Sequence, residues 1–107
     1  MEDCIFCKIV RGEIPKEFRY KDDNIVAFDD INPAAKTHVI FAPKEHIKAF
    51  EDLTSDAILG SVRLGMQKLI SEKNLAGVGY KIIVNGGGAQ IVDHLHFHLI
   101  GPIGLKV

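Results

Sequence analysis

The pattern of apolar and polar residues predicts β-strands in both halves of the chain. Apolar and β-branched residues fill four short segments, at residues 18–20, 25–28, 38–42 and 80–84. Aspartate and asparagine separate the first two segments, and an Asn-Pro pair precedes the third, as is typical of turns. The pattern therefore predicts a β-meander early in the chain and a further strand at residues 80–84.

Between residues 53 and 70 the apolar positions follow the period of an α-helix. They fall at Ile58, Leu59, Val62, Met66, Leu69 and Ile70. Thr54 is expected to cap the first turn, and Asn74 or Gly77 to end the helix. Two glycines inside the helix each cost about 1 kcal/mol relative to alanine. Close packing against the sheet or a second subunit would offset this cost, and we expect the second subunit.

Composition is typical of one soluble globular domain over residues 1–107. The chain is 47% hydrophobic and 25% charged. Its formal net charge is −1 and its cations are scattered, which argues against nucleic acid or a membrane surface as a partner. No apolar run reaches the roughly 18 to 20 residues of a membrane span, and the acidic start does not resemble a signal peptide. We expect a cytoplasmic protein.

Three histidines at two-residue spacing, His94, His96 and His98, carry the clearest chemical signal. In a strand over residues 94–100 the three imidazoles would share one face, and Leu95, Phe97 and Leu99 would share the other. Imidazoles titrate near neutral pH, bind metals and attack phosphorus. Two interpretations remain open: a metal site completed by His38 or His46, or a nucleophilic histidine with helpers.

A glycine-rich segment, Asn85-Gly86-Gly87-Gly88-Ala89-Gln90, lies just before the histidines. Consecutive glycines let backbone N–H groups surround an anion, although such a run alone is more often a simple turn. Beside three histidines, it favours a phosphate ligand.

Cys4 and Cys7 are the only cysteines. A reducing cytoplasm argues against a disulfide, and no strand precedes the pair as a thioredoxin-like motif requires. The pair then supplies half of a zinc site, or packs as two free thiols.

Several blocks of the sequence resemble the histidine triad (HIT) family. His94-Leu95-His96-Phe97-His98-Leu99-Ile100 matches the family motif of histidines alternating with apolar residues. Further matches, in the family's order, are Cys4-Ile5-Phe6-Cys7-Lys8-Ile9-Val10, Gly12-Glu13-Ile14-Pro15, Ala27-Phe28-Asp29-Asp30-Ile31-Asn32-Pro33, Thr37-His38, Pro43-Lys44-Glu45-His46-Ile47, and Asn85 with Gln90. The chain looks most similar to the small nucleotide-binding branch, whose members are homodimeric nucleoside phosphoramidases.

The resemblance implies an α+β fold: a five-stranded antiparallel sheet, one long helix and a short N-terminal helix. It also implies roles for individual residues. His96 would be the nucleophile, His98 the proton donor to the leaving group, His94 an orienting residue and His38 a partner that fixes tautomers. The nucleotide would be held by Phe28, Asp30, Ile31, Asn85, Gly88, Ala89 and Gln90. Asp30 would bind the ribose, and Phe28 and Ile31 would line the base pocket. A structural zinc ion would be bound by Cys4, Cys7, His46 and His94.

The expected activity is hydrolysis of purine nucleoside 5′-phosphoramidates, conjugates of AMP or GMP with an amine, through a nucleotidyl-histidine intermediate. The metal would not be required for the chemistry, and the protein would be a homodimer. The alternatives are a dinucleoside polyphosphate hydrolase, a metallohydrolase that uses the histidines as ligands, and a nucleotide-binding partner protein with little catalysis. The last is favoured by the short glycine segment and by Ile91, which stands where the family often has a small polar residue.

Overall fold

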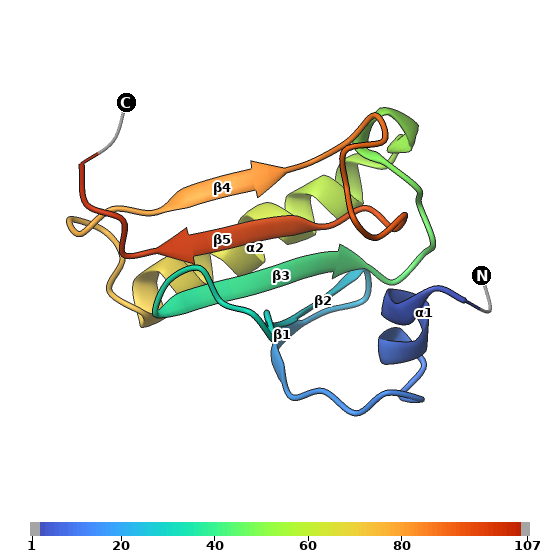
Figure 1. Cartoon of the computed structure of the whole chain (residues 1–107), viewed down its shortest axis with the longest axis horizontal. Helices are drawn as coiled ribbons and strands as arrows, with labels where there is room; N and C mark the ends of the chain where they lie inside the picture. Colours follow the sequence, from blue (N-terminus) through green and yellow to red (C-terminus); the bar gives the residue numbers. More distant parts are fainter. Residues whose placement is uncertain (1–2, 106–107) are drawn as a thin grey trace.

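A computed structural model describes residues 3–105 and contains one five-stranded antiparallel sheet (Figure 1). The strands lie in the order β1-β2-β3-β5-β4. The elements are α1 (Ile5–Val10), β1 (Phe18–Lys21), β2 (Ile25–Asp29), β3 (Thr37–Pro43), the 3₁₀ turn η1 (Phe50–Asp52), α2 (Asp56–Glu72), β4 (Lys81–Val84) and β5 (Phe97–Gly101). The predicted α+β fold, with one long and one short helix, is confirmed.

The prediction of a strand from residue 94 is wrong by three residues, because β5 begins at Phe97. The Leu95 N–H bonds to the carbonyl of Ile47, at 2.6 Å, outside the sheet. His94 also turns its ring toward the two cysteines. The predicted alternation nevertheless holds, since Leu95, Phe97 and Leu99 pack in the core on the α2 side of the sheet.

Helix α2 covers one face of the sheet and packs closely at Gly65. A Cβ atom added there would lie 2.8 Å from the Tyr20 ring and 3.0 Å from Phe41, so the packing requires glycine. At Gly60 an added Cβ would meet nothing within 4 Å. For Gly65, packing on the sheet accounts for the cost of a helical glycine, and the expected subunit contact is not needed.

The ends of α2 follow the usual rules of helix capping. Ser55, and not Thr54, is the N-cap, because its hydroxyl accepts the Ile58 N–H at 3.2 Å. At the other end Asn74 adopts a positive φ of 55°. The N–H groups of Asn74 and Leu75 bond back to Ser71 and Ile70, which is a Schellman motif.

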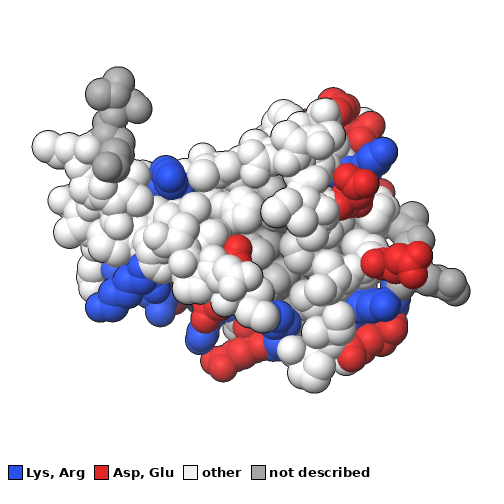
Figure 2. Space-filling model, viewed as in Figure 1, with Lys and Arg blue, Asp and Glu red and all other residues white. Residues whose placement is uncertain are grey.

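Helix α1 covers only part of the opposite face. Phe6 and Ile9 pack there on Val26, Phe28 and Ile40 as a second small core. The remainder of this face, over β3 and β5, is mainly uncharged in Figure 2, with charged side chains at its margins. Within residues 3–105, no helix combines the length and apolarity needed to cross a membrane.

Candidate active site and metal centre

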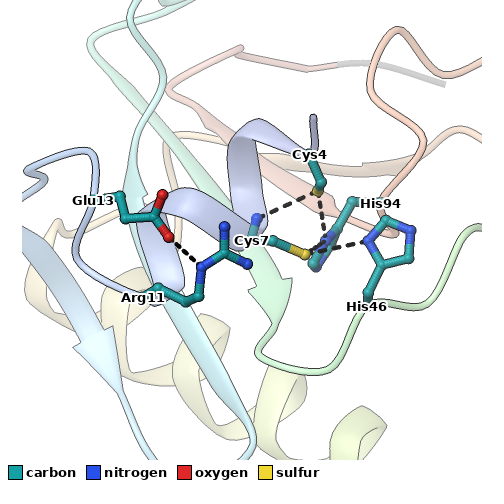
Figure 3. A network of polar contacts seen from close by, with 6 residues as sticks. All are labelled: Cys4, Cys7, Arg11, Glu13, His46 and His94. Atoms are coloured by element: carbon teal, nitrogen blue, oxygen red, sulfur yellow. Dashed lines mark hydrogen bonds and ion pairs between the residues drawn. The ribbon is translucent and has the colours of Figure 1, made fainter. Parts of the chain in front are cut away.

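Two cysteines and two histidines from distant parts of the chain converge beside α1 (Figure 3). Cys4 and Cys7, both free thiols, lie before and within the first turn of α1, and His46 follows β3. His94 Nδ1 lies 3.2 Å from Cys4 Sγ and 3.6 Å from Cys7 Sγ, and His46 Nδ1 lies 3.3 Å from Cys7 Sγ. The structure thus brings together the four residues predicted as zinc ligands.

The geometry of this cluster fits a tetrahedral metal ion. Zn–S and Zn–N bonds of about 2.3 and 2.1 Å place sulfur and nitrogen ligands about 3.5 Å apart. His94 Nε2 lies 2.8 Å from the Pro43 carbonyl, which can only accept, so Nε2 carries the proton. The lone pair of His94 therefore lies on Nδ1, facing the thiols. Metal-binding histidines typically donate such a hydrogen bond from the ring nitrogen that does not face the metal.

Burial makes the charged forms of this cluster costly. His94 is fully buried, and burial, together with the nearby His46 and His96, lowers its pKa. Burial and the contact with Cys4 raise the pKa of the Cys7 thiol. A bound cation would reverse the preference at sulfur, because metal ligands are thiolates.

His96 lies next to this cluster and is held in one tautomer. Its Nδ1 donates to the backbone carbonyl of His94 at 2.8 Å, so its lone pair lies on Nε2. The ring packs edge-on against Phe6, with centroids 4.9 Å apart, and lies 5.0 Å from the ring of His98. In the neutral form of this ring Nε2 is the nitrogen with the lone pair, and it is the atom that could act as a nucleophile.

His38 and His98 form a hydrogen-bonded pair with a defined direction. The Ala34 N–H donates to His38 Nδ1 at 3.0 Å, so the proton of His38 is on Nε2. This Nε2–H donates to His98 Nδ1 at 2.8 Å, which leaves the proton of His98 on Nε2. Burial and the neighbouring His96 and His38 lower the pKa of His98. His98 is therefore a neutral hydrogen-bond donor.

Asp30 lies beside this pair, at the end of the β2–β3 hairpin. Its Oδ2 is 3.3 Å from His38 Nε2, and its Oδ1 accepts the Asn32 N–H at 2.8 Å. Asp30 thus caps its own turn as well as contacting His38. Asp30, His38 and His98 also have the spacing of a metal site. However, the Ala34 N–H occupies His38 Nδ1 and leaves no lone pair on Nε2 for an ion.

The residues predicted to bind the base are placed differently from one another. Phe28 is only 2% exposed and packs in the second core, in edge-to-face contact with Phe6. Ile31, by contrast, is 80% exposed on the loop after β2. Of these two residues, Ile31 is the one that offers apolar surface to a ligand.

The glycine segment forms a tight turn. Gly87 and Gly88 have positive φ angles of 62° and 93°, and the Ala89 N–H bonds to the Gly86 carbonyl at 3.1 Å. The amide of Ala89 is thus used within the turn. Asn85 and Gly88 are exposed, as a ligand-binding role requires.

Gln90 is buried, and its side chain is partly committed to the protein. Its Nε2 donates to the Lys48 carbonyl at 2.8 Å, which fastens the glycine segment to the loop after β3. Among the described residues, its Oε1 has no hydrogen-bond partner. A buried acceptor of this kind can be satisfied by a bound ligand or water.

Sequence reasoning did not identify the backbone groups that set the tautomers. These are the carbonyls of Pro43 and His94 and the N–H of Ala34. Every residue has such groups, so no residue type in the sequence indicates them. Only the fold determines which of them meet an imidazole.

Comparison with known proteins identifies the family. Residues 3–104 match the family model described as "Scavenger mRNA decapping enzyme C-term binding". An uncharacterized HIT-like protein of Methanocaldococcus jannaschii is 41% identical over 100 residues, covering 91% of this chain and 77% of that protein. The purine nucleoside phosphoramidase of Escherichia coli K12 is 38% identical over 109 residues, covering 96% and 92%.

The solved structures agree with this result. A HIT family hydrolase from Legionella pneumophila has a TM-score of 0.88 and 38% identity, with 97% of this chain and 96% of that chain covered. This chain belongs to the histidine triad family, and its relatives include hydrolases. The predicted family membership is confirmed.

Proposed function

We propose that the protein hydrolyses purine nucleoside 5′-phosphoramidates, in which AMP or GMP is linked to an amine. The observation that carries this proposal is the fixed tautomer of His96, whose Nε2 lone pair is free to attack. The similarity to a purine nucleoside phosphoramidase supports the substrate class. The mainly uncharged face over β3 and β5 also fits a small nucleotide better than a long polyanion (Figure 2).

The reaction takes place in two displacements at phosphorus. His96 Nε2 attacks the α-phosphorus, the P–N bond to the amine breaks, and the amine leaves with the electron pair and takes a proton from solvent. Water then attacks the same phosphorus, the bond to Nε2 breaks, and a proton returns to solvent. The nucleoside monophosphate is released and His96 regains its lone pair.

His98 stabilises the charge that develops on the phosphoryl oxygens. Its Nε2–H is a donor next to the His96 ring. We assign it hydrogen-bond donation in place of the expected proton transfer to the leaving group. The reason is that a proton on His98 Nδ1 would face the Nε2–H of His38 across 2.8 Å.

The test is AMP release from an adenosine 5′-phosphoramidate of lysine. Wild type should release AMP, and His96→Ala should not while still binding AMP. Release that persists in His96→Ala would overturn the nucleophile assignment. Wild-type protein that cleaves only diadenosine polyphosphates, or that binds AMP and cleaves neither substrate, would overturn the phosphoramidase proposal.

We also propose that Cys4, Cys7, His46 and His94 hold a structural zinc ion. Four protein ligands leave no open position for substrate or water, so the metal would stabilise the fold and take no part in the reaction. The purified protein should contain about one zinc per chain. Its cobalt-substituted form should show thiolate-to-cobalt absorption, and the absence of both signals would contradict the proposal.

A homodimer is the third element of this proposal. Leu59, Tyr80 and Ile82 are each more than 40% exposed and line an apolar groove of about 310 Å³ between α2 and β4. A second copy of the chain could cover this surface. Sedimentation should show a dimer that Ile82→Lys converts to a monomer. A wild-type protein that stays monomeric at high concentration would contradict this.

A further inference from the structure

The carboxylate of Asp30 accepts one backbone hydrogen bond and lies beside Nε2 of His38. Oδ1 accepts from the Asn32 backbone, and Oδ2 lies 3.3 Å from Nε2 of His38. Both side chains are well shielded, with 17% of Asp30 and 7% of His38 exposed. The Asp30 N–H also bonds to the His38 carbonyl at 2.9 Å, so backbone and side chain both hold the two residues together.

The two neighbours of His38 favour the same tautomer. With its proton on Nδ1, His38 would point an N–H at the Ala34 N–H and turn a lone pair toward the Asp30 carboxylate. With its proton on Nε2, it accepts from Ala34 and presents an N–H between Asp30 and His98. The second arrangement removes both repulsions.

We propose that Asp30 is a positioning residue, which keeps the proton of His38 on Nε2. The hydrogen bond from His38 to His98 Nδ1 then keeps the proton of His98 on Nε2. The inference deepens the proposed function, because the Nε2–H of His98 is the donor that this function uses. It differs from the ribose contact expected for Asp30 in that it requires no hydroxyl on the substrate.

The contacts of Asp30 require a carboxylate. Oδ1 accepts from Asn32 and Oδ2 lies 3.3 Å from His38 Nε2, and an asparagine has only one oxygen. If the amide oxygen of Asp30→Asn accepts from Asn32, its NH₂ faces His38 Nε2 and favours a lone pair there. If the amide turns over, the turn loses its cap. The first arrangement loses the repulsion that keeps the proton on His38 Nε2, and the second loses the hydrogen bond from Asn32. In both, the Nε2–H of His38 keeps His98 Nδ1 as its acceptor.

The first test separates positioning from ribose binding. The kcat of wild type, Asp30→Asn and Asp29→Asn is measured on an adenosine 5′-phosphoramidate and on its 2′,3′-dideoxy analogue. Asp29 is the matched control, because it pairs with Arg19 (2.6 Å) and its substitution removes the same charge. We expect Asp30→Asn to lower kcat by about 10- to 100-fold on both substrates, as for other residues that orient a functional histidine. Asp29→Asn should leave kcat unchanged.

A loss that is confined to the ribose substrate, or that appears only in KM, would overturn the proposal in favour of hydroxyl binding. An equal loss in Asp29→Asn would overturn it as well, since the effect would then follow net charge.

The second test does not depend on activity. Imidazole ¹⁵N spectra of the free protein report which nitrogen of each histidine carries the proton. Wild type should show His38 and His98 with the proton on Nε2, and Asp30→Asn should shift both toward a mixture. Unchanged tautomers in a folded Asp30→Asn protein would overturn the proposal. If wild type cleaves neither phosphoramidate, the proposed function fails and the spectra still decide the role of Asp30.

Discussion

The two ends of the segment from His94 to His98 use histidine in opposite ways. At His94 the outer nitrogen donates to a carbonyl, so the lone pair faces two thiols. At His98, Nδ1 accepts a hydrogen bond from His38, so the proton of His98 is on Nε2. Residues of one type, four positions apart, thus present a lone pair to two thiols at one end and an N–H donor at the other.

An imidazole has two ring nitrogens, and the hydrogen-bond partner of one determines what the other can do. We call the nitrogen that is bonded within the protein the far nitrogen. A carbonyl as the far partner leaves a lone pair for a metal or for attack, as at His94 and His96. An N–H as the far partner turns the ring into a donor, as at His38. The four predictions below test this division, in order of decreasing expected effect.

His96→Ala should have the largest effect, because it removes the proposed nucleophile. Removing the nucleophile should lower single-turnover AMP release by roughly 10⁴-fold or more. Zinc content and AMP binding should stay at wild-type levels. AMP release that survives in His96→Ala but disappears with a zinc chelator would mean that the metal region carries the reaction.

His38→Phe should lower kcat by about 10- to 100-fold, because it removes the donor that fixes the His98 tautomer. His38→Gln keeps an N–H near the same place and should recover part of the loss. Steady-state kinetics on the phosphoramidate measures both. Zinc content should not change in either variant, and a parallel loss of zinc would contradict the separation of the two regions.

Cys7→Ser should act on stability and spare the His38–His98 pair. It should lower zinc content well below one per chain and the free energy of unfolding by about 2 kcal/mol, equivalent to roughly 10 °C in Tm. Metal analysis and thermal unfolding measure the two effects. The imidazole spectra of His38 and His98 should be unchanged at a temperature where the variant is folded.

The pH dependence of stability should show a smaller effect at His98. Burial and the neighbouring His96 and His38 lower its pKa, so below about pH 6.5 the unfolded chain binds more protons than the folded one. The contribution of His98 is therefore fully present above pH 6.5 and is lost as the pH falls toward the lowered pKa. Urea unfolding between pH 8 and 5 should show a weaker pH dependence for His98→Asn than for wild type.

The sequence predicted the fold well because its main signals are periodic. The spacing of two in residues 94–99 and the helical spacing from Ile58 to Ile70 each describe a face that packs on the core. The start of β5 was not predictable, since it depends on the hydrogen bond from Leu95 to Ile47 and on the contacts of His94 with the cysteines.

The candidate site divides in the same way. Cys4, Cys7, His46 and His94 could be named from residue type and family blocks, and the structure brings them together. The burial of Phe28 depends on what packs against it. Tautomers depend on backbone groups, which no sequence pattern reveals.

The bond from the Leu95 N–H to the Ile47 carbonyl also has a consequence for motion. It holds the segment that carries His96 to the loop after β3, and not to the sheet. Local opening of this loop would expose the Leu95 amide to hydrogen exchange while the amides of β5 remain protected. The exchange rate of that single amide is therefore a direct measure of how often the His94–His96 segment detaches from an otherwise folded protein.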